Sequence, residues 1–199
     1  MTQVPCSLVR SSIVSLTIAF TALSVAQVNV AGSANGGTAS QSSLYSFGTS
    51  EKGNDGNRDG RWDSLSVMHT GFELGAWYKI DFATPTDISQ VNVFNRTDSW
   101  TERLSPFTVS LALNGNEVWS APNQTFNPNI NDGNPFASGM SFMMSSVLAD
   151  SVMVKLDRTE WLHVAELEAI SAVPEPATLS VLAIGAVFLM RRRKSVIRS

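Results

Sequence analysis

Cysteine is almost absent from this chain. The one cysteine among 199 residues, Cys6, precedes an apolar run near the N-terminus and is remote from the central part of the sequence. A domain built from that central part therefore cannot depend on disulfides. Histidine is scarce as well, because His69 and His163 are the only two. Two histidines without cysteine do not make a zinc site of the usual kind.

Sequence signatures of common enzymes are also missing. The chain has no G-x-S-x-G, no Walker motif and no dinucleotide-binding fingerprint. Glu166 and Glu168 are two positions apart, so they would share one face of a strand. A glycosidase needs two carboxyl groups that face each other across the substrate, and neighbours on one strand seldom do so. We therefore expect no catalytic activity.

Both ends of the chain have the composition of export signals. Arg10 precedes the apolar run 12–20, and small residues follow as far as Ala26, which predicts a signal peptide over residues 1–26. Residues 173–199 contain Pro-Glu-Pro, then a short apolar run, then three arginines and a lysine. The basic cluster is a cytoplasmic anchor, so this segment predicts a transmembrane helix with a basic tail.

The order of these three C-terminal parts resembles the PEP-CTERM sorting signal. The resemblance implies processing by an exosortase in a Gram-negative bacterium that makes an extracellular polysaccharide matrix. It also implies passage through the inner membrane, followed by location at the cell surface or in the extracellular matrix of a biofilm. The remaining residues, 27–172, are enough for one domain of ordinary size.

The central domain differs in net charge from the two ends of the chain. Residues 27–172 contain 8 basic and 16 acidic residues, a net charge of about −8, although the whole chain carries −3. Such an acidic domain does not suit nucleic acid, which selects a basic surface. It does suit an extracellular domain that contains calcium.

The apolar pattern of the central domain is that of strands. Apolar residues alternate with polar ones over 107–113, and Asn114-Gly115 then offers a type I′ turn. Similar alternation recurs at 78–82 and 152–156, and no sustained helical period occurs between the two ends. This pattern predicts an all-β fold, a β-sandwich of the jelly-roll type. Residues 121–139, rich in Asn and Pro, predict a long loop.

A candidate sugar site lies in the stretch N-R-T-D-S-W-T-E-R, where Arg96 and Arg103 are seven positions apart. Guanidinium groups give several donors in a fixed plane, and the imidazole of His69 adds another, as a sugar's hydroxyl and ring oxygens require. We expect Asp98 to hold one arginine through a charge-assisted bond and Trp100 to cover an apolar face of the sugar. Each residue alone is common on a surface or in a core. Only their joint spacing favours a site.

That spacing resembles the signature of the F-type lectins, or fucolectins, of the discoidin and galactose-binding-like superfamily. His69 precedes Arg96 by 27 positions, and Arg96 begins an R-x-D-x4-R segment. The flanking sequence over about 39–172 resembles that of the same family. The resemblance implies that His69, Arg96 and Arg103 contact L-fucose and that Asp98 orients them. Many fucolectins have two adjacent cysteines where this chain has Ser99-Trp100. We expect Trp100 to supply the missing apolar contact, and the choice between fucose and a similar sugar stays open.

The resemblance also implies a bound calcium ion that joins an early loop to the last strand. The matching positions are Asp55, Asn57, Ser66 and Glu166. Their hard oxygen atoms suit calcium, which also accepts backbone carbonyls. A polar surface loop without an ion is the alternative.

The sequence as a whole predicts an exported, calcium-containing carbohydrate-binding protein. Its expected partners are L-fucose or a similar sugar in glycans or exopolysaccharide, the exosortase, and the membrane before processing. The rival hypothesis is a non-catalytic structural protein of the matrix whose sugar site has degenerated.

Overall fold

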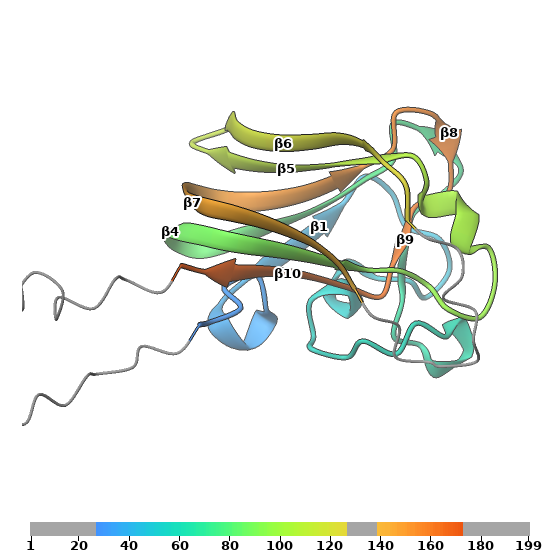
Figure 1. The fold of residues 1–199 in the computed structure, drawn as a ribbon. Helices are drawn as coiled ribbons and strands as arrows, with labels where there is room; N and C mark the ends of the chain where they lie inside the picture. The colour runs from blue at the N-terminus through green and yellow to red at the C-terminus, as the bar shows by residue number, and fades with distance from the viewer. Residues whose placement is uncertain (1–26, 127–138, 173–199) are drawn as a thin grey trace, which may run out of the picture. The chain divides into compact units, whose positions relative to one another are not determined.

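A computed structural model of the chain describes residues 27–126 and 139–172 (Figure 1). The predicted signal peptide, the predicted sorting signal with its membrane helix, and most of the predicted loop at 121–139 lie outside these residues. Helix is confined, in the two described ranges, to short 3-10 turns: η1 Ser33–Asn35, η2 Ser50–Gly53, η3 Trp62–Ser64 and η4 Thr101–Leu104. None of them is long and apolar enough to cross a membrane.

Two long antiparallel strands, β4 (Trp77–Phe94) and β7 (Met140–Lys155), form the frame of the domain. Their pairing is interrupted between Asp81 and Thr86, where Pro85 has no N–H to donate to the ladder. Both strands turn back near the left end of Figure 1, so each contributes to two layers. Because β4 and β7 stay paired on both sides of this turn, each layer contains one part of β4 beside one part of β7.

The remaining strands extend these layers, and every pairing is antiparallel. One layer has β1, β5 and β6 beside the first part of β4 and the second part of β7, whereas β10 pairs with the second part of β4. Two ladders of two residues each, β2 with β9 and β3 with β8, lie at the right end in Figure 1. The bounds are β1 Thr38–Gln41, β2 Met68–His69, β3 Glu73–Leu74, β5 Phe107–Leu113, β6 Asn116–Gln124, β8 Thr159–Glu160, β9 His163–Val164 and β10 Glu166–Ser171. The predicted all-β sandwich is confirmed.

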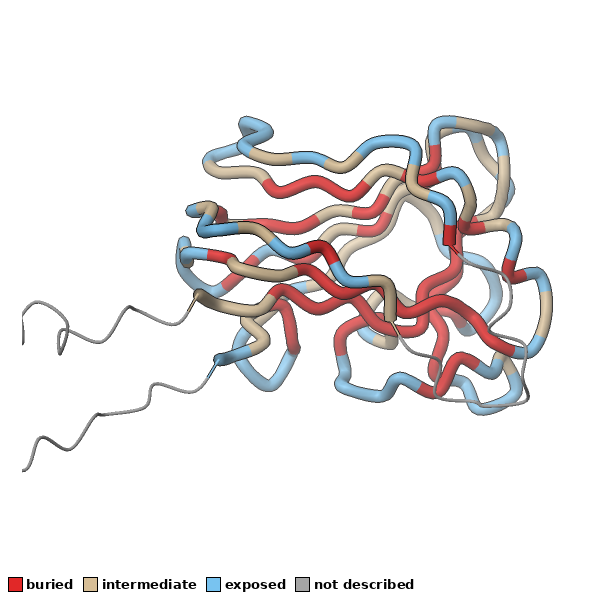
Figure 2. The backbone as a smooth tube through the Cα atoms, viewed as in Figure 1, coloured by how far each residue is buried: buried red, intermediate tan, exposed pale blue. Residues whose placement is uncertain are grey.

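The core lies between the two layers, where Figure 2 shows the buried backbone. Alternation puts Tyr78, Ile80, Val109 and Leu111 fully inside, while Lys79 and Asp81 are more exposed and Ser110 is buried on the other face of β5. The Tyr78 hydroxyl, although buried, donates to the Ser50 carbonyl at 2.9 Å. Burial of apolar surface from both layers therefore stabilises a domain without disulfides.

The hairpin of β5 and β6 has the predicted turn, but β6 is longer than expected. Asn114 and Gly115 both have positive φ, 52° and 77°, as a type I′ turn requires. The strand then continues to Gln124, so the predicted loop is wrong for residues 121–124. Pro122 is tolerated there because β6 is an edge strand, where a missing N–H costs no ladder bond.

The two ends of the described domain are joined to each other. Val28 N–H donates to the Ser171 hydroxyl at 3.0 Å, and Ser171 N–H donates to the Val28 carbonyl at 2.9 Å. Both ends lie at the left of Figure 1, whereas β2, β9 and η4 lie at the right. The two ends of the described domain therefore lie together, at the end opposite to β2, β9 and η4.

The core analysis predicts a large effect of shortening Leu111. Leu111→Ala should lower the free energy of unfolding by about 2–5 kcal/mol, because the fully buried side chain leaves a cavity between the layers. Denaturant unfolding of both chains measures this difference. Val118→Ala, on the exposed side of neighbouring β6, is the matched control and should change it by less than about 0.5 kcal/mol. Equal effects of the two variants would contradict the assigned core.

Candidate functional site

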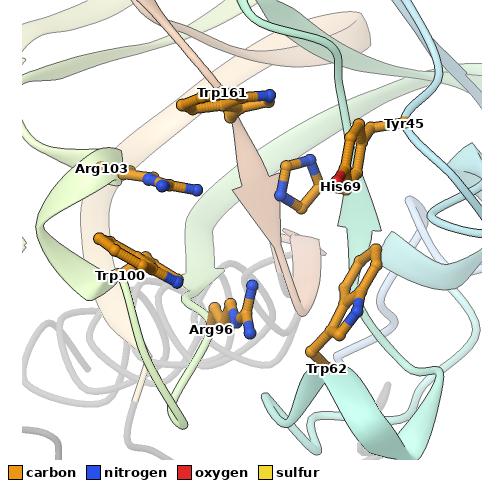
Figure 3. A pocket seen from close by; sticks show the side chains of 7 residues that line it. All are labelled: Tyr45, Trp62, His69, Arg96, Trp100, Arg103 and Trp161. Carbon is orange, nitrogen blue, oxygen red and sulfur yellow. The ribbon is translucent and has the colours of Figure 1, made fainter.

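A cavity of about 380 Å³ opens among the loops near β2, β9 and η4 (Figure 3). This volume suits a small ligand. The side chains that line it are Tyr45, Trp62, His69, Arg96, Trp100, Arg103 and Trp161. Four of the five predicted sugar-binding residues are thus brought together, and Asp98, the fifth, contacts Arg96 beside the cavity. Glu166 and Glu168 do not line it.

His69 presents an acceptor to the cavity. It lies on β2, almost completely buried, and its Nδ1 is 2.7 Å from the Thr70 carbonyl oxygen. Because a carbonyl only accepts, Nδ1 carries the hydrogen, which leaves Nε2 as an acceptor in the neutral ring. Burial lowers the pKa of His69, and the charges of Arg96 and Arg103 also lower it. This geometry differs from our sequence-based expectation that the imidazole donates.

Arg96 is fixed by Asp98, as the sequence predicts. It follows β4, and its Nε and Nη2 donate to the two carboxylate oxygens of Asp98 at 2.5 and 3.2 Å. Its Nη2 also donates to the Ser99 hydroxyl, and Asp98 accepts a further bond from the Trp62 N–H at 2.9 Å. Burial raises the pKa of Asp98, but the bonds from Arg96 and Trp62 outweigh it and lower that pKa overall. Within the described residues, Nη1 of Arg96 has no hydrogen-bond partner and can donate to a ligand.

Arg103 is held between two indole rings. Its guanidinium carbon lies 4.3 Å from the ring centre of Trp100 and 4.5 Å from that of Trp161 (Figure 3). Such cation–π contacts stabilise a guanidinium that has little water around it. The Glu160 carboxylate lies 3.7 Å from Nε, and neither terminal nitrogen has a hydrogen-bond partner in the described ranges, so both can donate to a ligand. The sequence predicted Trp100 as a cover for the sugar, which stays a prediction, and the structure shows its ring against Arg103.

The two arginines do not make the cavity strongly positive, because each has a carboxylate partner. Asp98 pairs with Arg96, and Glu160 pairs with Arg103. The site therefore combines fixed N–H donors, one neutral acceptor and almost no net charge. An anion could use the donors but would have no hydrogen for His69. A hydroxyl group can accept from an arginine and donate to the imidazole at the same time.

Three aromatic residues of the cavity were not predicted from the sequence. Tyr45 and Trp62 lie beside His69, with ring centres 4.9 and 5.1 Å from the imidazole, and Trp161 lies beyond Arg103. They come from separate segments of the chain, Trp62 from η3, and no local motif marks them. The Tyr45 N–H donates to the His69 carbonyl at 3.0 Å, which attaches its loop to β2.

Three of the four predicted calcium ligands lie between η2 and β2, and the fourth, Glu166, contacts that segment from β10. Glu166 is fully buried on β10, and both of its carboxylate oxygens accept from the Gly56 N–H, at 3.2 and 3.3 Å. Burial first, and the charge of Asp55 second, raise the pKa of Glu166 to about 8. Asp55 accepts from the Asn57 N–H at 2.8 Å, and the Ser66 hydroxyl donates to a carbonyl of the same loop.

Side chains alone do not complete a metal site there. Within residues 27–126 and 139–172, no group of three or more His, Cys, Asp or Glu side chains is placed to hold a metal ion. Asp55 and Glu166 would need amide, hydroxyl or backbone carbonyl oxygens beside them. Calcium is the ion that accepts such a mixed oxygen set.

Comparisons with known proteins find similarity to two family models and to sugar-binding relatives. Residues 52–141 match the family model of the NedA-like, galactose-binding domain, and residues 172–194 match that of the PEP-CTERM protein-sorting motif. Fucolectin-6 of Anguilla japonica is 27% identical over 123 residues, which are 60% of this chain and 62% of that protein. The predicted resemblance to the fucolectins is confirmed. The chain thus spans somewhat less than two thirds of that relative.

Solved structures of similar domains cover most of the described fold. The lectin domain of lectinolysin, complexed with Lewis B antigen, is 29% identical with a TM-score of 0.64, over 73% of this chain and 98% of that one. A fucose binding module of Streptococcus pneumoniae is 29% identical with a TM-score of 0.65, over 73% of this chain and 96% of that one. These relatives are a lectin domain and a fucose binding module, and the present chain is similar to both in sequence and in fold.

His163, the second histidine, is buried directly behind the site. It pairs with His69 across β2 and β9, their ring centres are 5.5 Å apart, and His163 has no exposed surface. Neither of its ring nitrogens has a hydrogen-bond partner in the part of the chain that the structure describes. Burial first, and the neighbouring His69 and Arg96 after it, lower the pKa of His163 to about 3. The ring therefore stays neutral at ordinary pH.

This burial predicts that His163 makes the domain less stable in mild acid. The unfolded chain takes up a proton near pH 6.5 and the folded chain only near pH 3, so stability falls as pH drops between these values. His163→Leu should make the fall less steep by about 1.4 kcal/mol per pH unit. Unfolding of both chains between pH 8 and 4.5 measures the difference. Parallel curves for the two chains would show that His163 is not buried in a neutral state.

Proposed function

We propose that this chain is an exported, non-catalytic lectin whose cavity binds L-fucose. One observation carries the proposal: the free N–H groups of Arg96 and Arg103 meet the free acceptor of His69 in one nearly neutral cavity. Adjacent hydroxyl groups of a sugar can bond to all three residues, because each hydroxyl accepts and donates. Both guanidinium groups are already fixed, so little conformational entropy is lost when the sugar binds.

The aromatic walls favour a deoxy sugar. Tyr45 and Trp62 give the cavity an apolar side next to His69, where a methyl group would contact carbon atoms. A hydroxymethyl group in the same place would bury a hydroxyl without a partner, which costs free energy. L-fucose has this methyl group, and L-galactose has the same ring hydroxyls with a hydroxymethyl group instead. The fucose binding module among the similar structures supports this choice.

The lectin hypothesis predicts that the two arginines are needed for binding but not for folding. Arg96→Ala/Arg103→Ala should weaken L-fucose binding at least 100-fold, because each charge-assisted bond contributes about 1.5–3 kcal/mol. Calorimetric titration of the purified full chain with L-fucose, and then with L-galactose, measures this loss and the preference for the methyl group. Arg61→Ala, an exposed arginine outside the cavity, is the control.

The rival hypothesis, a structural protein with a degenerate site, predicts a different result. It requires that the unmodified chain bind neither L-fucose nor L-galactose while it remains folded. Binding that survives in the double variant would contradict our assignment of the donors. Tighter binding of L-galactose than of L-fucose would contradict the proposed contact of the methyl group with Tyr45 and Trp62.

We further propose that calcium stabilises the loop next to the site. Glu166 and Asp55 would hold the ion together with oxygen atoms of Asn57 and of the loop around Ser66. Within the described residues the fully buried Glu166 carboxylate accepts only from the Gly56 N–H, and a cation beside it would offset the cost of charging it there. When bound, calcium would supply positive charge that attaches the loop at Asp55 to β10.

Calcium should therefore raise the thermal stability of the full chain in the absence of sugar. At 100 times the dissociation constant, the gain is about 2.7 kcal/mol, or roughly 5–10 °C in the unfolding midpoint. Scans with calcium and with chelator measure it. Glu166→Gln should remove the gain, whereas Asp63→Asn, an exposed acid of the same region, should keep it. Equal midpoints with calcium and chelator in the unmodified chain would exclude the ion.

The match to the sorting motif implies export and membrane-associated processing in bacteria. We propose an exosortase as the processing partner and the cell surface or the extracellular polysaccharide matrix as the destination. A lectin attached there would bind fucose-type sugars of the producing cell's own polysaccharide or of neighbouring cells.

A further inference from the structure

One short segment of the chain, residues 158–161, contacts Arg103 at three different groups. The Trp161 ring lies 4.5 Å from its guanidinium carbon, and the Glu160 carboxylate lies 3.7 Å from its Nε (Figure 3 shows the two rings on either side of Arg103). The third contact is to the backbone, because Arg158 Nη2 donates to the Arg103 carbonyl at 2.6 Å. Trp161 lines the cavity, whereas Arg158 does not.

Arg158 differs from the other arginines of the described ranges in its partners. The other four each pair with a carboxylate, and they are Arg58, Arg61, Arg96 and Arg103. Arg158 forms no ion pair within residues 27–126 and 139–172 and donates instead to two backbone carbonyls, to Pro106 from Nη1 at 2.9 Å and to Arg103 from Nη2. Its rigid set of donors therefore joins two points of the backbone rather than a charge.

The two carbonyls lie at the end of η4, the 3-10 turn that carries Arg103. The last carbonyls of a helical turn have no partner within it and need a donor from elsewhere. At the start of η4, the Asn95 amide donates to the Thr101 carbonyl at 2.8 Å. A single turn has few hydrogen bonds of its own, so contacts from outside determine its orientation. Asn95 supplies such a contact at one end of η4, and Arg158 supplies it at the other.

Arg158 is itself fixed in the fold. Its carbonyl accepts from the Gly75 N–H at 3.2 Å, beside the ladder of β3 with β8. Rotation of η4 away from this ladder would carry the Arg103 guanidinium out of contact with Trp161 and Glu160. Because binding groups must be held to within about 0.5 Å of their working positions, even a small rotation would matter.

We propose that Arg158 is a positioning residue of the sugar site, which orients Arg103 by joining the end of η4 to the turn between β7 and β8. The inference rests on the proposed function, because it concerns how Arg103 presents its N–H groups to L-fucose. Arg158 acts only through Arg103 and does not contact the sugar. Arg96 is held by its own carboxylate, Asp98, and is independent of Arg158. The two arginines of the cavity should therefore respond differently to the loss of Arg158.

Arg158→Met in the full chain tests this proposal, because methionine keeps an unbranched apolar side chain and removes both donors. Calorimetric titration should show L-fucose binding weakened about ten-fold, since a misplaced Arg103 loses part of its charge-assisted bonding. Arg158→Lys keeps the charge but not the planar pair of donors, so its affinity should lie between the two. Lys155→Met is the matched control. It removes a positive charge that pairs with exposed Asp157 at the same end of β7, and it should change the affinity by less than about two-fold.

Nuclear magnetic resonance separates positioning from a general loss of stability. The Nε–H signals of the two arginines report their guanidinium groups, and each is assigned as the signal that disappears in Arg103→Lys or in Arg96→Lys. In Arg158→Met the Arg103 signal should shift or broaden. The Arg96 signal should stay in place, because Asp98 still accepts from its Nε.

Two results would overturn the positioning role of Arg158 alone. One is L-fucose binding by Arg158→Met within about two-fold of the unmodified chain. The other is a loss of affinity with equal changes in both arginine signals, which a general loosening of the domain would cause. If Arg158→Met does not fold, the same comparisons are made with Arg158→Lys. If the unmodified chain itself does not bind L-fucose, the proposed function fails, and this inference fails with it.

Discussion

The bond between Asp98 and Arg96 is the contact on which the candidate site depends. One carboxylate accepts from two nitrogens of the guanidinium and from the backbone of Trp62, so it joins the loop after β4 to the loop before β2. The side of the cavity formed by Trp62 therefore keeps a fixed distance from the side formed by Arg96. A cavity made only of loops would otherwise lose its shape with each loop movement. The same bond also cancels most of the charge that Arg96 would bring to the ligand.

A second constraint is the lack of any disulfide beside Arg103. In the resemblance to the fucolectins, two adjacent cysteines occupy the place of Ser99 and Trp100. Here Trp100 adopts a left-handed backbone conformation, with φ of 60°, and its ring stacks on the guanidinium. Trp161 stacks on the other side. Two flat indoles thus orient Arg103 without a covalent link, and they leave an exposed aromatic edge at the rim of the cavity.

Much of the fold, and the polar part of the site, could be predicted from the sequence. Alternation marks β5 because its two faces differ in burial, and Asn114-Gly115 marks the turn because few other pairs tolerate two positive φ values. Arg96 and Asp98 could be found because their contact is local in the chain. The extent of β6 was missed because an edge strand tolerates Pro122, which the sequence presents as a loop residue.

The remaining features of the site depend on tertiary structure. Tyr45, Trp62 and Trp161 come from three separate segments, so no spacing in the sequence links them to the arginines. The protonation of His69 depends on its burial and on the Thr70 carbonyl, which are properties of the folded chain. The ends of the domain, by contrast, are tied together by Val28 and Ser171, far from the cavity. A surface attached to either end of the described domain would therefore leave the cavity uncovered.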